Sequence, residues 1–113
     1  VPGGHRVPRS FATYERLRRH MEEHYRRLRS VEDVASECGV TQVHVSRLFQ
    51  RFAHVGAYQF LVRLKMNDAA ELLDNGLLVK EVAERLVFLD AFQFSRAFKR
   101  VHGVSPSRLQ KRS

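Results

Sequence analysis

The chain lacks the features that several protein classes require. It has a single cysteine, Cys38, so no disulfide can form within the chain, and we interpret it as a core thiol. No apolar run approaches the roughly 18 residues of a membrane-spanning helix, and the first residues lack the apolar core of a signal peptide. No G-x-S-x-G, P-loop or paired-cysteine motif is present. We therefore expect a cytoplasmic protein that is not an enzyme and needs no cofactor.

Acidic residues are few, and they are unevenly distributed. The 113 residues include 20 Lys and Arg against 12 Asp and Glu, a formal charge of +8. This charge favours a polyanionic partner, with nucleic acid a larger class than anionic membranes. Acidic residues are absent from 38–67 and from 91–113. A surface that faces phosphates requires such gaps, although basic residues can also simply decorate a solvated face. The basic residues in the gaps include Arg47, Arg51, Arg63, Lys65, Arg96, Lys99, Arg100, Arg108, Lys111 and Arg112.

The first half of the chain shows helical periodicity after a lead-in or linker over residues 1–9. Apolar residues recur every three or four positions from Phe11 to Leu28, which predicts a long amphipathic helix. Ser30 and Asp33 resemble a capping box that begins a short helix, and Gly39 ends it in a turn. Thr41 can cap the next helix, for which we expect an exit at Gly56. Residues 10–56 therefore predict a first subdomain that contains a helix, a tight turn and a helix.

The second half repeats this design after one long helix. Residues 57–75 contain no helix breaker and end at Asn75-Gly76. Two further helices, with a turn over 87–90 between them, are expected up to Gly103. Ser105 and Pro106 begin a last short helix. The sequence thus predicts an all-α fold of about seven helices, with a linker helix at 57–75 and a second subdomain at 76–113.

The two subdomains share an internal repeat. Val31 and Ala35 align with Val79 and Ala83 at an offset of 48 residues, and Ser46-Arg47 aligns with Ser95-Arg96 at an offset of 49. A shared core pattern of two helical hairpins explains part of this similarity. It does not explain the Ser-Arg pair, which lies off the apolar stripe. We therefore interpret the chain as two copies of one bihelical unit.

The repeat and the segment from Phe88 to Pro106 carry a family resemblance. FLDAFQFSRAF, at 88–98, and FKRVHGVSP, at 98–106, resemble the signature of the AraC/XylS family of bacterial transcription regulators. The resemblance covers about residues 11–109. The chain departs from the family pattern at Val87, where Gly is usual, and at Leu78, where Ser or Thr is usual. It also has Leu109-Gln110 in place of an aromatic residue and Arg, and no Pro after Gly56.

The resemblance implies double-stranded DNA as the ligand and two helix-turn-helix units. The recognition helices would be about 42–54 and 91–101, each in the major groove, with phosphates held by helix ends and loops. The expected base-contacting residues are Gln42, Val43, Ser46, Arg47, Ala91, Phe92, Gln93, Ser95 and Arg96. The expected phosphate-contacting residues are Thr41, Arg51, Lys99, Arg100 and Ser105. Two alternatives stay open: Phe92 can instead complete the core, and Gln93 can simply be solvated.

The linker helix sets how far apart the two units lie. At about 1.5 Å per residue, residues 57–75 span about 28 Å, close to the ~34 Å between major-groove segments one turn apart. A bend of the DNA by tens of degrees would supply the remaining reach at a cost of a few kcal/mol. One chain can then occupy two successive major-groove segments.

The sequence also carries features that bear on partners and sites other than DNA. A helical module that binds a protein such as RNA polymerase is the rival function, and in a transcription activator both functions coexist. Relatives often carry a separate effector and dimerisation domain, and the linker-like start at Val1 favours such a domain upstream. His20 and His24 lie one helical turn apart but lack a third ligand, so we interpret them as a solvated pair and expect no metal.

Overall fold

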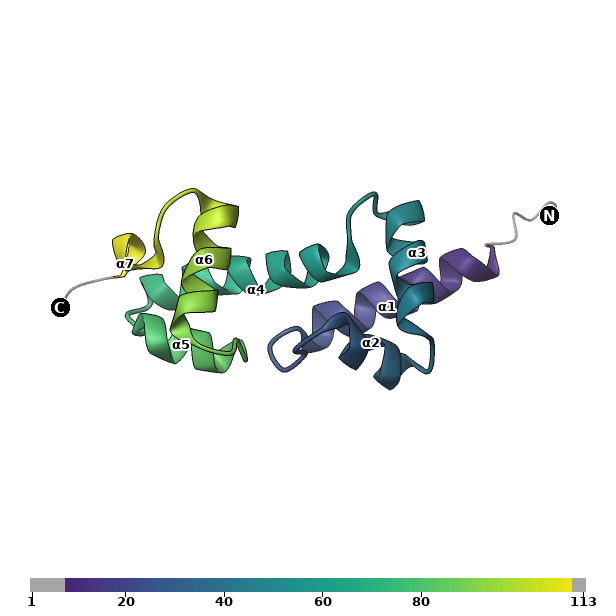
Figure 1. Ribbon diagram of the computed structural model, residues 1–113, viewed down its shortest axis with the longest axis horizontal. Coiled ribbons are helices and arrows are strands. Elements are labelled where there is room, and N and C mark those ends of the chain that lie inside the picture. The colour runs from purple at the N-terminus through teal and green to yellow at the C-terminus, as the bar shows by residue number, and fades with distance from the viewer. Residues whose placement is uncertain (1–7, 111–113) are drawn as a thin grey trace.

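The computed structural model describes residues 8–110, and within this range the chain forms seven α-helices and no strand. The predicted all-α fold is confirmed. Figure 1 shows two groups of helices joined by the long helix α4. The helices are α1 (Arg9–His24), α2 (Val31–Cys38), α3 (Gln42–Phe52), α4 (Ala57–Asp74), α5 (Val79–Arg85), α6 (Ala91–His102) and α7 (Pro106–Leu109). Lys111, Arg112 and most of the expected lead-in lie outside the described residues.

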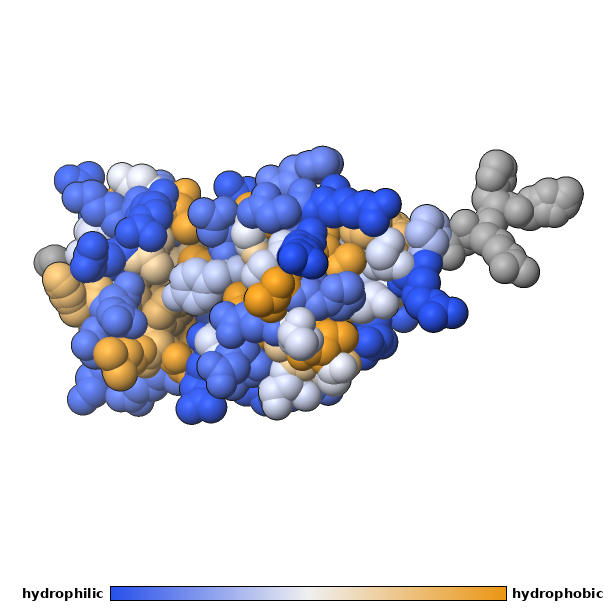
Figure 2. Space-filling view, turned by 45° about the vertical axis from the view of Figure 1, so that its right-hand side comes forward, coloured by the Kyte–Doolittle hydropathy of each residue, from blue (hydrophilic) through white to orange (hydrophobic). Residues whose placement is uncertain are grey.

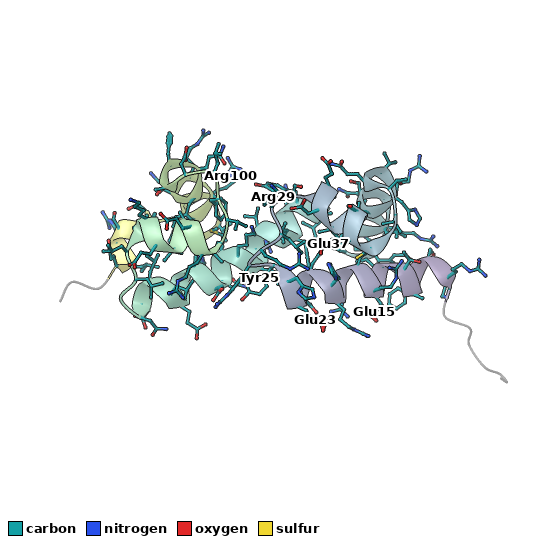
Figure 3. The ribbon with its side chains drawn as sticks, turned by 90° about the horizontal axis from the view of Figure 1, so that it is seen from below. Glu15, Glu23, Tyr25, Arg29, Glu37 and Arg100 are labelled. Carbon is teal, nitrogen blue, oxygen red and sulfur yellow. The ribbon has the colours of Figure 1, made fainter. Side chains whose placement is uncertain are left out.

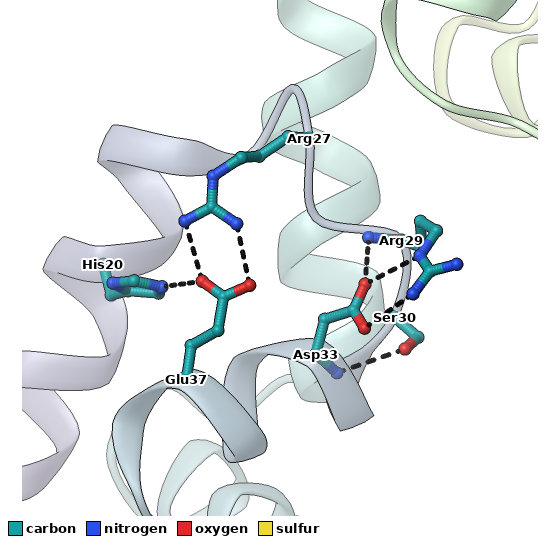
Figure 4. A network of polar contacts seen from close by, with 6 residues as sticks. All are labelled: His20, Arg27, Arg29, Ser30, Asp33 and Glu37. Carbon is teal, nitrogen blue, oxygen red and sulfur yellow. Dashed lines mark hydrogen bonds and ion pairs between the residues drawn. The ribbon is translucent and has the colours of Figure 1, made fainter.

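Local capping signals fix the first helix-turn-helix unit. The Ser30 hydroxyl accepts a hydrogen bond from the Asp33 backbone N–H, and the Thr41 hydroxyl accepts one from the His44 N–H at 3.1 Å. Gly39 ends α2 with a left-handed φ of 71°. The Asp33 carboxylate accepts from the N–H of Arg29 rather than of Ser30, because the Arg29 guanidinium holds it there (Figure 4). The predicted capping box is therefore only half formed.

The second unit uses different caps in the same places. The side chain of Leu78 has no oxygen with which to accept a hydrogen bond, so α5 begins with the Glu81 carboxylate accepting the Leu78 N–H at 2.8 Å. Asp90 caps α6 by accepting the Gln93 N–H at 2.8 Å. Gly103 ends α6 with a φ of 80°. The two units thus share one backbone path with different residues at the helix ends.

Two turns depart from the expected glycine positions. The predicted recognition helix over 42–54 ends at Phe52, and His54 takes the left-handed conformation with a φ of 57°. Gly56, the expected exit, instead lies in extended backbone as the N-cap of α4. Val87 has a φ of 52° in the turn between α5 and α6, at the position where Gly39 stands in the first unit. A β-branched residue is strained in this region.

Helix α4 contributes to two hydrophobic clusters, one for each helix-turn-helix unit. Its first half packs with α1, α2 and α3, and its second half packs with α5 and α6. Each unit therefore has its own core. Full burial of each large apolar side chain in it stabilises the fold by roughly 1.5–3 kcal/mol. The buried members are Tyr14, Leu17, Met21, Leu28, Val31, Val34, Ala35, Val45, Leu48, Phe49, Ala57 and Leu61 in the first cluster, and Met66, Ala69, Leu72, Leu73, Val82, Ala83, Leu86, Phe94 and Phe98 in the second.

Polar contacts hold α4 against both units. Arg26, just after α1, donates two hydrogen bonds to the buried Asp68 carboxylate, at 2.6 and 2.9 Å. Lys65 is only 3% exposed, and its ammonium donates to the Leu86 carbonyl at the end of α5. The sequence analysis placed Lys65 among the basic residues of a phosphate-facing surface. This prediction is wrong, because the Lys65 side chain is buried and its ammonium binds the Leu86 carbonyl in the second turn. Burial lowers the pKa of Lys65 to about 8.

The side chains of α1 and α2 form a network of ion pairs. The Glu37 carboxylate accepts two hydrogen bonds from Arg27 at 2.7 Å and lies 2.8 Å from Nε2 of His20 (Figure 4). The Arg27 guanidinium, with His20, lowers the pKa of Glu37 to about 2. Burial raises the pKa of the Cys38 thiol, which packs against the first cluster as expected of a core thiol. Within residues 8–110, no helix combines the length and hydrophobicity needed to cross a bilayer.

Candidate nucleic-acid interface

Helices α3 and α6, the second helices of the two units, lie on the same side of the molecule. In Figure 1 the two helices run nearly parallel, α6 crossing α4 and α3 crossing α1, and Figure 3 shows both from their ends on one side. Each helix buries one stripe against its own cluster, with Val45, Leu48 and Phe49 in α3 and Phe94 and Phe98 in α6. The opposite stripes therefore face solvent in a common direction.

The exposed stripe of α3 contains all four residues that the sequence assigned to base contact in the first unit. Gln42, Ser46 and Arg47 are exposed, and Val43 is 61% exposed although it is apolar. Thr41 lies at the start of the helix, where its hydroxyl already accepts the His44 N–H. The structure therefore brings these side chains together on one accessible surface.

The corresponding residues of α6 are arranged in the same way. Phe92 is 60% exposed, so the interpretation of this ring as part of the core is wrong. The Arg96 guanidinium lies over the Phe92 ring, 5.7 Å from its centroid, within the range of a cation–π contact. Gln93 is exposed, while Ala91 and Ser95 are half-buried.

The expected phosphate-contacting residues surround the two recognition helices. Lys99 and Arg100 are exposed in the last turn of α6. Arg51 is exposed near the end of α3, where it donates a 3.4 Å hydrogen bond to Ser10. Ser105 is half-buried before α7, with its hydroxyl 3.1 Å from that of Ser107. These residues lie at helix ends, as phosphate contacts do in helix-turn-helix proteins.

The basic side chains of the molecule differ in whether they pair with a carboxylate. Arg18, Arg26, Arg27 and Arg29 form ion pairs with carboxylates. In contrast, the described part of the chain offers no hydrogen bond or ion pair to the side chains of Arg47, Arg63, Arg96, Lys99 and Arg100. Arg9, Arg19, Arg85 and Arg108 on other helices also lack such partners within the described residues. The position of the second group on α3, α4 and α6 is what makes its charge available to an anion beside the expected base-contacting residues.

Part of the negative charge lies on the opposite side of the molecule. Figure 3 shows Glu15 and Glu23 on the side of α1 that is opposite to the recognition helices, while Arg29 and Arg100 lie on the side of the recognition helices. Figure 2 shows a largely hydrophilic surface with small hydrophobic patches. Among residues 8–110 no three His, Cys, Asp or Glu side chains gather closely enough to hold a metal ion. The unpaired basic side chains on α3 and α6 are what distinguish this surface.

A family model described as a helix-turn-helix domain matches residues 34–112, more than half of the chain. The chain belongs to the AraC/XylS family. The C-terminal domain of AraT, a response regulator from Geobacillus stearothermophilus, superposes with a TM-score of 0.80 and 31% identity, covering 91% of this chain and 87% of that one. The DNA-binding domain of AdpA, solved in complex with a target DNA, has a TM-score of 0.75 and 24% identity, covering 85% and 87%.

The curated relatives are longer than the chain. The HTH-type transcriptional regulator YijO from Escherichia coli is 33% identical over 100 residues, which are 88% of this chain and 35% of that protein. The chain spans about a third of the length of the curated relatives it matches. The AraC/XylS family is one of DNA-binding regulators rather than of enzymes. The predicted family and the two helix-turn-helix units joined by a linker helix are confirmed.

Proposed function

We propose that this AraC-type domain binds a specific double-stranded DNA site and thereby regulates transcription, with α3 and α6 in two successive major-groove segments. The observation that carries the proposal is the common direction of the two exposed stripes, both with unpaired arginines. A duplex presents its major groove on one side once per turn, which two helices on one side of a protein can follow. AdpA, a structure of the same fold, was solved with its target DNA.

Base recognition belongs to the exposed stripes of α3 and α6. Arg47 and Arg96 occupy the same place in the two repeats, and an arginine there can donate two hydrogen bonds to O6 and N7 of guanine. Val43 and Phe92 are exposed apolar side chains at the starts of these helices, where a thymine methyl can cover them. The side-chain amide of Gln93 can donate a hydrogen bond to N7 of adenine and accept one from its N6 amino group. Gln42, Ser46, Ala91 and Ser95 complete the proposed base-contacting set.

Phosphate contacts then position the two helices. Thr41, Arg51, Lys99, Arg100 and Ser105 are the residues we propose for this role. Such contacts strengthen binding to every sequence alike because phosphates carry no sequence information. The subdomain bounds 10–56 and 76–113 stay predictions from the sequence, and the 18 residues of α4 give a separation of about 27 Å. The shortfall from ~34 Å favours a bent DNA.

This function belongs in the bacterial cytoplasm, where such a regulator meets its DNA. Contact with RNA polymerase, and an N-terminal effector or dimerisation domain, stay predictions from the sequence.

Fluorescence anisotropy on duplexes selected from a random pool tests the proposal. The logarithm of affinity should fall linearly with the logarithm of salt concentration. Arg47→Ala and Arg96→Ala should each remove preference at particular bases, at a cost of about 1–3 kcal/mol, whereas Lys99→Ala should weaken all sites alike. Weak binding without sequence preference in the wild type would favour the protein-interaction module instead.

A further inference from the structure

A groove of about 940 Å³ lies between α4 and α6. Its α4 wall includes Gln59, Arg63 and Asn67, which are spaced four residues apart and therefore form one line along the helix. Its α6 wall includes Arg96 and Arg100, which the base and phosphate assignments already use. The groove thus continues the surface of α6 onto α4, a helix that so far joins the two units and contributes to both of their cores.

The lining of this groove contains no carboxylate. Two polar side chains, Gln59 and Asn67, flank the Arg63 guanidinium, and all three are exposed. Within residues 8–110 the side chain of Arg63 makes no ion pair or hydrogen bond. The acidic residues of α4 start at Asp68, whose carboxylate is held by Arg26. The same line of α4 continues to the exposed Glu71, one turn beyond Asn67, so its carboxylate-free part is the three residues beside the groove.

A second hollow extends the same positive surface towards the first unit. It is about 250 Å³ in volume, shares Tyr58 and Val62 with the groove, and is lined by Arg29 as well. Figure 3 places Arg29 between the two units, on the side of the recognition helices. Its guanidinium is exposed even though it pairs with Asp33. The space between α3 and α6 is therefore lined by basic and neutral side chains across α4.

We propose that this groove of α4 holds the sugar-phosphate backbone of the DNA segment between the two base-contacted major-groove segments, with Arg63 as its main phosphate ligand. The inference rests on the proposed function. Between two major-groove segments on one side, a duplex presents its minor groove, which is ~6 Å wide and bordered by both backbones. α4 lies opposite this segment when α3 and α6 occupy their grooves, so the linker helix is itself a DNA-contacting element.

The first test compares Arg63→Ala with Arg19→Ala. Arg19 is a matched control because it is exposed, lacks an ion pair within the described residues, and lies on α1 between Glu15 and Glu23. Anisotropy over a salt series should show that Arg63→Ala reduces the salt slope by about 0.9 and weakens binding about eightfold at 0.1 M salt. The loss should be equal for selected and unrelated duplexes. Arg19→Ala should leave both quantities unchanged, and thermal unfolding should confirm that both variants fold.

A second measurement locates the contact on the DNA. Uncharged methylphosphonates in place of the phosphates between the two base-contacted blocks should weaken the wild type but not further weaken Arg63→Ala. Equal weakening of both proteins, or a salt slope for Arg63→Ala equal to that of Arg19→Ala, would overturn the inference. If the wild type still selects two blocks of sequence in that case, the proposed function stands and only the role of the groove fails. If the wild type selects no sequence, the proposed function itself has failed.

Discussion

Replacing Val87 by glycine should stabilise the domain. An L-residue in the left-handed region costs about 1–2 kcal/mol, and a β-branched one such as Val87, with its φ of 52°, lies at the upper end. Glycine removes that cost but loses about 0.5–1 kcal/mol through the entropy of its unfolded chain. Val87 is 38% exposed, so the removal of its side chain costs less than the removal of a buried one. The net gain is about 1 kcal/mol.

Chemical denaturation followed by circular dichroism measures this gain directly, and thermal unfolding should show a midpoint about 4 °C higher. Gly39 provides the matched control because it holds the same place in the first turn, with a φ of 71°, and a Cβ there would meet no atom within 4 Å. Gly39→Val should therefore destabilise the domain by about 1 kcal/mol through backbone strain alone. Stability that stays equal or falls in Val87→Gly would refute the reasoning.

Three further outcomes follow from the contacts. Burial lowers the pKa of Lys65 to about 8, so the unfolded chain binds a proton more tightly between pH 8 and 10.5; the unfolding free energy of the wild type should rise by about 3 kcal/mol across this window relative to Lys65→Met, and parallel pH profiles would contradict this. Arg26→Ala should lose about 2 kcal/mol in urea denaturation because it leaves the buried Asp68 carboxylate unpaired, and an unchanged midpoint would count against that ion pair. Replacing the thymine that Phe92 contacts by uracil should weaken wild-type binding roughly fourfold, the equivalent of one buried methyl group, and should leave Phe92→Ala unaffected; equal losses in both proteins would exclude that contact.

The fold could be predicted from the sequence where local chemistry determines it. Ser30 and Thr41 are hydroxyl residues directly before apolar-periodic runs, and both cap a helix as expected. Gly39 and Gly103 end helices because they can adopt a positive φ. These signals lie within one turn of the residue that produces them. Their agreement with the periodicity is why the order and number of helices were predictable.

The rest depended on tertiary contacts. The sequence shows Lys65 only as a basic residue in an acid-free stretch, whereas its burial depends on the Leu86 carbonyl 21 residues away. α3 ends at Phe52 and α4 begins after Gly56, so the left-handed residue between the two helices is His54 rather than Gly56. Phe92 could not be assigned from its sequence position, since the direction of its ring depends on where α6 meets the second cluster. The groove on α4 likewise exists only once α6 packs beside it.

Selection from random duplexes, carried out with the wild type, Arg47→Ala and Arg96→Ala, tests most directly whether two similar helices recognise two major-groove segments of one DNA. The wild type should enrich two blocks of sequence about 10 base pairs apart. Each variant should lose one block, a different one in each case, and keep the other. A single enriched block, or loss of the same block in both variants, would contradict the account.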